Sequence, residues 1–338
     1  MGFSITGGVS ITGGVSLLPP GGSPTPSGGG FQGTISGYAS GGYNPVGSGA
    51  KETAIQKYSF TSDGNASDIG DLTVGRNTAS GQSSSTSGYT SGGSPSSGST
   101  TIDKFSFANE GAATDVGDIT VATTWMSGQS SSDNGYATSG NLGAPTYAKS
   151  SNMDKISFSS DGNATNVASL DVGVDQATGQ SSTDNGYVSG GSGSSRGQIV
   201  IQKFPFASDN NASDIGDITR SVETPMGQSS TVSGYTSGGS PGGTGQTTID
   251  KFPFASDSNA SDVADLFQGA RAGSGSSSTA SGYVAGTDSP VNNTIQKFSF
   301  ATDQNGTDVG DLVTGCLLYT SDAADDSLRV DLGGRRII

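Results

Sequence analysis

Acidic and amide side chains recur at alternate positions in a phrase of the form D-x-N-x-[ST]-D. Oxygen ligands spaced in this way can bind Ca²⁺, as they do in calcium loops that begin D-x-[DN]-x-[DN]-G. The phrase begins at Asp63 and reappears twice, which makes its first two oxygen positions weak calcium candidates. Its members are Asp63, Asn65, Ser67 and Asp68; Asp209, Asn211, Ser213 and Asp214; and Asp257, Asn259, Ser261 and Asp262.

A turn without metal is the favoured interpretation of the same phrase. No glutamate follows it as a bidentate ligand, and a second copy has Glu110 and Ala112 where a shared metal site should have kept its ligands. Asp and Asn side chains commonly bond the local backbone in Asx turns between strands. We therefore predict no metal or cofactor. The N-x-[ST] sequons beginning at Asn65, Asn163, Asn211, Asn259 and Asn305 arise from this same turn.

One lysine recurs at a fixed position, and an aspartate recurs nearby. Two interpretations are open: a ring of cross-strand ion pairs, which we favour, or a ring of charge that binds an anion on an axis. Each exposed pair would contribute about 0.2–1 kcal/mol. The lysines are Lys57, Lys104, Lys155, Lys203, Lys251 and Lys297, and the acids are Asp68, Asp115, Asp214, Asp262 and Asp308, with Asn166 in the third copy.

Catalysis by a histidine-based constellation is excluded by composition. The chain has no histidine, and its one cysteine, Cys316, lies outside the repeated region. A serine hydroxyl without an adjacent base is a weak nucleophile, so the many serines do not indicate an active site. The protein is expected not to be an enzyme.

Composition also narrows the partners. The net charge is −15, whereas duplex nucleic acid and anionic membranes both attract a basic face. Hydrophobic residues make up 30% of the 338 residues and glycine occupies 56 positions, which indicates a thin, distributed core. The N-terminus lacks a basic leader, so we predict no signal peptide and no membrane insertion. A virion-associated or extracellular location is favoured.

Two aromatic markers reveal six copies of one unit that would position these residues. A Gly-Tyr pair recurs at intervals of 47–51 residues, and a phenylalanine marker repeats with it. The intervals differ only in Gly/Ser/Pro loops. The tyrosines are Tyr38, Tyr89, Tyr136, Tyr187, Tyr235 and Tyr283, and the phenylalanines are Phe60, Phe107, Phe158, Phe206, Phe254 and Phe300.

Each unit predicts four short β-strands: GQSSS, GYTSGG, TTIDKFSF and SDVGDL. In the third strand, Ile102 and Lys104 face one way while Phe105 and Phe107 face the other, so both faces carry packing groups. A sheet buried on both faces suits a propeller blade. In the last segment Ile69 and Leu72 are three apart, so either a bulge intervenes or the strand ends early.

This strand order resembles the Kelch family, and a period near 50 residues suits Kelch better than WD40. The resemblance implies an all-β, Kelch-like β-propeller of six four-stranded blades, with seven as the alternative count. The sequence departs from the family at Gly81, Gln82 and Ser83, where Arg and His are usual, and in lacking the outer Trp. The best-known Kelch-type enzyme, galactose oxidase, is similar in fold only, because its copper site needs histidine. The recurring phrases also resemble uncharacterised environmental phage repeat proteins.

The units predict boundaries of 31–77, 78–126, 127–177, 178–225, 226–271 and 272–315, after a flexible Gly/Pro-rich leader at 1–30. Residues 316–338 share nothing with the repeats and resemble a translated transposon-type sequencing adapter. We therefore leave them out of the fold prediction as a non-native tail. Six units close the ring if the degenerate stretch from Phe31 to Ile35 supplies the inner strand of the first blade, whereas a natural gene with a seventh unit would leave an open gap in the present chain.

The framework is constant, whereas the loops after the Gly-Gly pairs change in length and content, as in SPSSGST and NLGAPTYAKSS. Scaffolds diversify binding in this way. We expect a non-catalytic binding or virion/cell-surface scaffold whose loops contact a protein or glycan receptor. The alternatives are a purely structural fibre or decoration subunit and, least favoured, an enzyme on a galactose-oxidase-like propeller.

Overall fold

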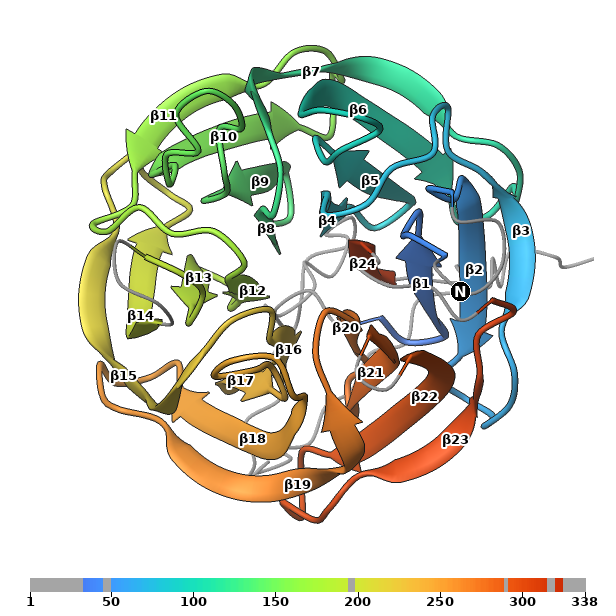
Figure 1. The fold of residues 1–338 in the computed structure, drawn as a ribbon, viewed down its shortest axis with the longest axis vertical. Coiled ribbons are helices and arrows are strands. Elements are labelled where there is room, and N and C mark those ends of the chain that lie inside the picture. Colours follow the sequence, from blue (N-terminus) through green and yellow to red (C-terminus); the bar gives the residue numbers. More distant parts are fainter. Residues whose placement is uncertain (1–32, 45–49, 194–197, 289–290, 315–319, 325–338) are drawn as a thin grey trace, which may run out of the picture.

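The protein is a six-bladed β-propeller (Figure 1). The computed structural model describes residues 33–44, 50–193, 198–288, 291–314 and 320–324. Every blade is a four-stranded antiparallel sheet, and the blades follow one another around a central axis. None of these residues belongs to a helix long and apolar enough to cross a membrane. The predicted leader at 1–30 lies outside the described residues.

The strands nearest the axis are short and rich in glycine and serine. These inner strands are β4 (Ser80–Ser83), β8 (Ser127–Ser130), β12 (Thr178–Ser181), β16 (Met226–Ser229), β20 (Ser274–Ser277) and β24 (Thr320–Ala324). The second strands carry the Gly-Tyr marker. They are β1 (Ser36–Ser40), β5 (Ser87–Ser91), β9 (Asn134–Thr138), β13 (Asn185–Ser189), β17 (Ser233–Ser237) and β21 (Ser281–Asp288).

The third strands carry the lysine marker, and each ends one residue before the phenylalanine marker. They are β2 (Ala54–Ser59), β6 (Ser99–Ser106), β10 (Asn152–Ser157), β14 (Gln198–Pro205), β18 (Gln246–Pro253) and β22 (Val291–Ser299). The fourth strands form the outer rim. They are β3 (Ser67–Asp71), β7 (Thr114–Thr123), β11 (Thr165–Ser169), β15 (Ser213–Val222), β19 (Ser261–Ala270) and β23 (Thr307–Asp311).

The first blade differs from the others in where its inner strand comes from. Strand β24 pairs with β1 in antiparallel register, with Thr320 opposite Ser40 and Ala324 opposite Ser36, so the two ends of the chain meet in one sheet. The prediction that Phe31–Ile35 supplies this strand is therefore wrong. Residues 316–338 were left out of the fold prediction, and this was also wrong for Thr320–Ala324, which form a strand. The resemblance of this tail to a translated sequencing adapter concerns its origin and stays a prediction.

The two-faced third strand is confirmed. In the second blade, Phe105 and Phe107 pack against Tyr38 of the first blade, while Ile102 packs with residues of the third. The tyrosine of each blade stacks on the phenylalanine marker of the next, with ring centroids 4.5–5.0 Å apart at all six junctions. Offset aromatic pairs of this kind contribute about 0.5–1.5 kcal/mol beyond their area. The core is thus six thin layers between blades.

A β-bulge explains the spacing in the fourth strand. Gly70 lies opposite Ile55 and Asp68 lies opposite Gln56, so Ile69 is the extra residue. The first of the two sequence-based alternatives is therefore confirmed. In a regular strand, residues three apart point to opposite faces of the sheet. The extra residue of the bulge changes this alternation, so Leu72 is buried and Ile69 packs against the same cluster.

Small residues on the inner strands let neighbouring blades approach closely at the axis. A Cβ atom added at Gly128 would overlap the carbonyl oxygen of Gly81 on the preceding blade. In the second to fifth blades a glutamine follows this glycine and donates its amide to the next blade, as Gln82 does to the Tyr136 carbonyl over 3.2 Å. The repeated G-Q-S sequence therefore joins neighbouring blades.

The junction between the sixth and first blades has its own pair of side chains. The sixth blade has Ser276 where the inner strands of the second to fifth blades have glutamine. The first blade has Tyr58 at a position where the second blade has Phe105, which carries no hydroxyl. The two hydroxyl oxygens lie 2.5 Å apart, and both residues are buried. These two departures from the repeat compensate each other only if the first blade follows the sixth, which supports six blades over seven.

A double-mutant cycle tests this junction. Tyr58→Phe or Ser276→Gln alone is expected to lower the free energy of unfolding by about 1–2 kcal/mol, because each leaves a buried polar group unpaired or crowded. The double variant has the phenylalanine and glutamine that stand at these positions at other junctions, so its free energy of unfolding should be near that of wild type. Additive effects in urea unfolding would contradict direct contact.

Alkaline pH gives the same cycle a second readout. Burial raises the pKa of Tyr58 above its ordinary value. Its contribution to stability is therefore complete below about pH 10 and is lost as pH rises toward the folded-state pKa. The advantage of wild type over Tyr58→Phe should fall above pH 10 by about 1.4 kcal/mol per pH unit.

Candidate functional site

We call the end of the ring at which the inner strands begin the upper face, and the opposite end the lower face. The variable loops after the Gly-Gly pairs lie on the upper face, because each second strand ends there. Backbone bridges join those loops to the segments that enter the inner strands, as between Ser94 and Asn77 and between Asn141 and Thr124. Loops that differ between blades therefore border the axis.

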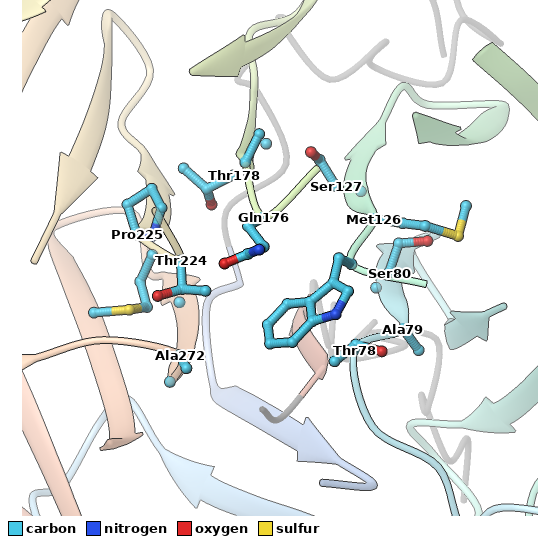
Figure 2. A pocket seen from close by; sticks show the side chains of 18 residues that line it. Thr78, Ala79, Ser80, Met126, Ser127, Gln176, Thr178, Thr224, Pro225 and Ala272 are labelled. Carbon is cyan, nitrogen blue, oxygen red and sulfur yellow. The ribbon is translucent and has the colours of Figure 1, made fainter. Parts of the chain in front are cut away.

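A pocket opens at the centre of the upper face (Figure 2). Its cavity volume is about 100 Å³. Among the residues that line it, one from each of five blades stands two positions before the inner strand. We call these five residues the central ring: Thr78, Trp125, Gln176, Thr224 and Ala272.

The central ring has an unusual backbone. All five residues are non-glycine, yet all have φ between 53° and 58°. Such left-handed conformations are uncommon for side-chain-bearing residues and persist where surrounding structure imposes them. Here a chain of backbone hydrogen bonds runs around the axis, in which Trp125 donates to the Thr78 carbonyl over 2.8 Å and Gln176 donates to the Trp125 carbonyl over 3.1 Å. Thr224 and Ala272 continue it.

A fixed backbone therefore carries side chains of four different types. The ring includes the only tryptophan of the sequence, an amide, two hydroxyls and a methyl group. The inner strands that follow change less, reading S-G-Q-S, S-G-Q-S, T-G-Q-S, M-G-Q-S and S-G-S-S. Sequence reasoning missed this set. The signal that was available is that the residues directly before these strands vary between units, whereas the strands stay nearly constant.

The Thr78 hydroxyl is polar, buried and unpaired within the described part of the chain. Its side chain is 7% exposed, and its Oγ1 atom has no hydrogen-bond partner there. A buried hydroxyl without a partner is unfavourable by about 1–3 kcal/mol. Thr78 lines the pocket (Figure 2), and a ligand hydroxyl or carbonyl could complete this bond once rotation about χ1 turns the shielded Oγ1 atom into the pocket.

Blade three contributes most to the upper face. Its loop holds Tyr147, whose side chain is 64% exposed, and its entry segment holds Trp125. Lys149 anchors the loop by an ion pair with Asp175, 2.5 Å away in the entry segment of the fourth blade. Two accessible aromatic rings thus share one face and one blade.

The aspartates of the calcium candidates lie on the lower face, where they join blades. The ammonium of Lys297 in the sixth blade lies 2.9 Å from the Asp63 carboxylate in the first. Lys297 donates a hydrogen bond to Asp63, and this bond raises the pKa of Lys297. Partial burial acts in the opposite direction and lowers it. Six such pairs complete the ring: Lys57–Glu110, Lys104–Asp161, Lys155–Asp209, Lys203–Asp257, Lys251–Asp303 and Lys297–Asp63.

The expected ion partners within the blade were wrong, although a ring of lysine–carboxylate ion pairs is present. Each lysine contacts the first acid of the turn in the next blade. The sequence places that acid 52–57 residues further on for the first five lysines and 234 residues earlier for Lys297. The last aspartate of the phrase has a different contact: Asp68 accepts the Gly70 amide over 3.2 Å, and Asp214 accepts the Gly216 amide over 3.0 Å. These contacts lie within the outer strands, so they are of the Asx type but are not the turn between two strands that the sequence suggested.

The asparagines of the phrase also bridge blades. Asn65 Oδ1 accepts the Asp311 amide over 3.0 Å, Asn211 accepts that of Ser169 over 3.0 Å, and Asn259 accepts that of Asp217 over 3.1 Å. Among the described residues, no three acidic side chains gather around a common point. The structure therefore places Asp63, Asp209 and Asp257 in the ring of six ion pairs. It places Asn65, Asn211 and Asn259 in backbone contacts that repeat at five junctions between blades.

The fold and site together define a β-propeller with a repeated lower face and a varied upper face. No protein-family model matches the sequence, and no match was found among the curated proteins.

Proposed function

We propose that this propeller is a non-catalytic binding scaffold on the surface of a virion or cell, and that its upper face contacts a receptor or glycan. One observation carries the proposal: side chains vary from blade to blade on the upper face and repeat on the lower face. Scaffolds that recognise partners vary their loops over a constant frame. The strand order and period also support a distant Kelch-like relationship, and the repeated phrases support one with environmental phage proteins.

Two equally exposed side chains on opposite faces provide a matched test. Tyr147 is 64% exposed on the upper face, and Val232 is 65% exposed in a lower-face turn. Tyr147→Ser is expected to weaken binding of the full chain to immobilised bacterial surface polysaccharides or intact bacterial cells by at least fivefold. Val232→Ser should leave binding unchanged, and both variants should melt as wild type does.

The alternative functions give different results in this experiment. A purely structural fibre or decoration subunit would bind none of the polysaccharides or cells, and neither substitution would matter. Equal losses from both variants would show that the upper face is not the contact surface. Turnover of a bound polysaccharide would overturn the non-catalytic assignment.

A further inference from the structure

The central pocket presents chemistry that complements a neutral, hydroxyl-rich ring. Trp125 lines the pocket together with Thr78 and Gln176, two of the side chains labelled in Figure 2. An aromatic ring offers an apolar surface of high contact area, and neighbouring hydroxyl and amide groups offer both donors and acceptors. The described lining residues carry no ionisable side chain. Recognition at this place must therefore come from stacking and neutral hydrogen bonds.

Other ligand classes fit these groups less well. An anion would meet no cationic partner in the described lining and would approach a chain with a net charge of −15. A purely apolar ligand would leave the buried Thr78 hydroxyl unpaired and would desolvate the Gln176 amide without replacing its hydrogen bonds. A sugar ring has apolar C–H faces and hydroxyls around its edge, which is the combination these side chains can satisfy.

The backbone around the pocket is organised before any ligand arrives. The chain of hydrogen bonds through Thr78, Trp125, Gln176, Thr224 and Ala272 fixes the direction of each side chain. A preformed site loses less conformational freedom on binding than a flexible loop does. Ala272 contributes only a methyl group to the lining, so it takes up less space than Trp125 does.

We propose that the pocket binds one neutral sugar unit of a larger glycan, stacked on Trp125 and hydrogen-bonded by Thr78 and Gln176. This inference rests on the proposed binding function and specifies its ligand class. The upper-face loops, including that of Tyr147, would contact the remainder of the glycan. No bond is made or broken.

Trp125 is its own reporter, because the sequence contains no other tryptophan. Titrating the full chain with neutral monosaccharides, among them glucose, galactose, mannose and N-acetylglucosamine, should change its tryptophan fluorescence saturably for at least one of them. Thr78→Val keeps the side-chain shape and removes the hydroxyl, so it should weaken that sugar about fivefold. Thr86→Val, in the lower-face turn of the same blade, is the matched control and should change nothing.

Calorimetry with Trp125→Ala gives a readout independent of fluorescence, and sugar binding should be lost while the melting temperature shows the ring intact. If polysaccharides bind in a Tyr147-dependent manner but Trp125→Ala and Thr78→Val bind them normally, the sugar pocket is wrong and the binding function survives. Stronger binding of sialic or uronic acids than of neutral sugars would overturn the ligand class. If no sugar or polysaccharide binds, the sugar pocket is wrong, and if intact bacterial cells are not bound either, both proposals fail.

Discussion

Replacing Asp103 with glutamine is expected to lower the free energy of unfolding by about 3–5 kcal/mol, because it leaves a buried cation without its counter-ion. The Asp103 carboxylate lies 2.7 Å from the Arg76 guanidinium, and the two side chains are 0% and 1% exposed. Burial lowers the pKa of Arg76, against the stabilising charge of Asp103. The Arg76 guanidinium also donates a hydrogen bond to the Thr90 carbonyl. Because the guanidinium is buried, water cannot replace the lost carboxylate.

The other blades supply the matched control. Three of them have glutamine at the position of Asp103, including Gln202, and the fourth and fifth have Val174 and Val222 at the position of Arg76. Gln202 bonds the backbone of Val172 in the preceding blade. Arg76→Val combined with Asp103→Gln should therefore regain wild-type stability or exceed it, since apolar replacement of a buried pair is often neutral or favourable. A double variant as unstable as Asp103→Gln would contradict this account.

Rewriting the inner strand of the first blade should stabilise the protein. Thr320–Ala323 reads T-S-D-A, at the register positions that read S-G-Q-S in the second blade. Changing these four residues to S-G-Q-S should raise the free energy of unfolding by about 2–4 kcal/mol. Glycine would match the close approach of neighbouring inner strands, and the glutamine amide would reach the Tyr89 carbonyl as Gln82 reaches that of Tyr136.

A variant with S-G-E-S at residues 320–323 separates the effect of the glycine from that of the glutamine hydrogen bond. Glutamate has the length of glutamine but no amide donor, so this variant should show only part of the gain in stability in thermal or urea unfolding. If S-G-Q-S is no more stable than the original strand, the first blade does not hold its inner strand as the other five do.

The blades could be predicted from the sequence because their markers are local. Tyr89 and Phe107 repeat in register, and alternation along one strand predicts which neighbour each side chain contacts. The partners of the lysines could not be predicted, since Lys104 pairs with Asp161 across a junction that is known only once blade order and stagger are known. Proximity in sequence favoured Asp115 instead.

Two further features leave little trace in residue types. Hydrogen bonds around the axis impose a left-handed backbone at Trp125 and Gln176. Neither tryptophan nor glutamine favours this conformation, so the residue types do not predict it. The strand at Thr320–Ala324 is positioned by backbone pairing and by connection length: eight positions separate Leu312 from Thr320, as they separate Leu72 from Ser80. Pattern-based reasoning looks for side chains and therefore passes over it.

The closed junction between the sixth and first blades has a kinetic consequence. In an open solenoid the terminal repeats have one neighbour and fray first, whereas here Tyr283 stacks on Phe60 just as every other tyrosine stacks on its partner. Because β24 and β1 are distant in sequence, the last step of folding joins segments almost 300 residues apart, and such high contact order slows folding. Once joined, no blade can peel away without breaking two interfaces, so unfolding should be slow, concerted and free of partially melted forms.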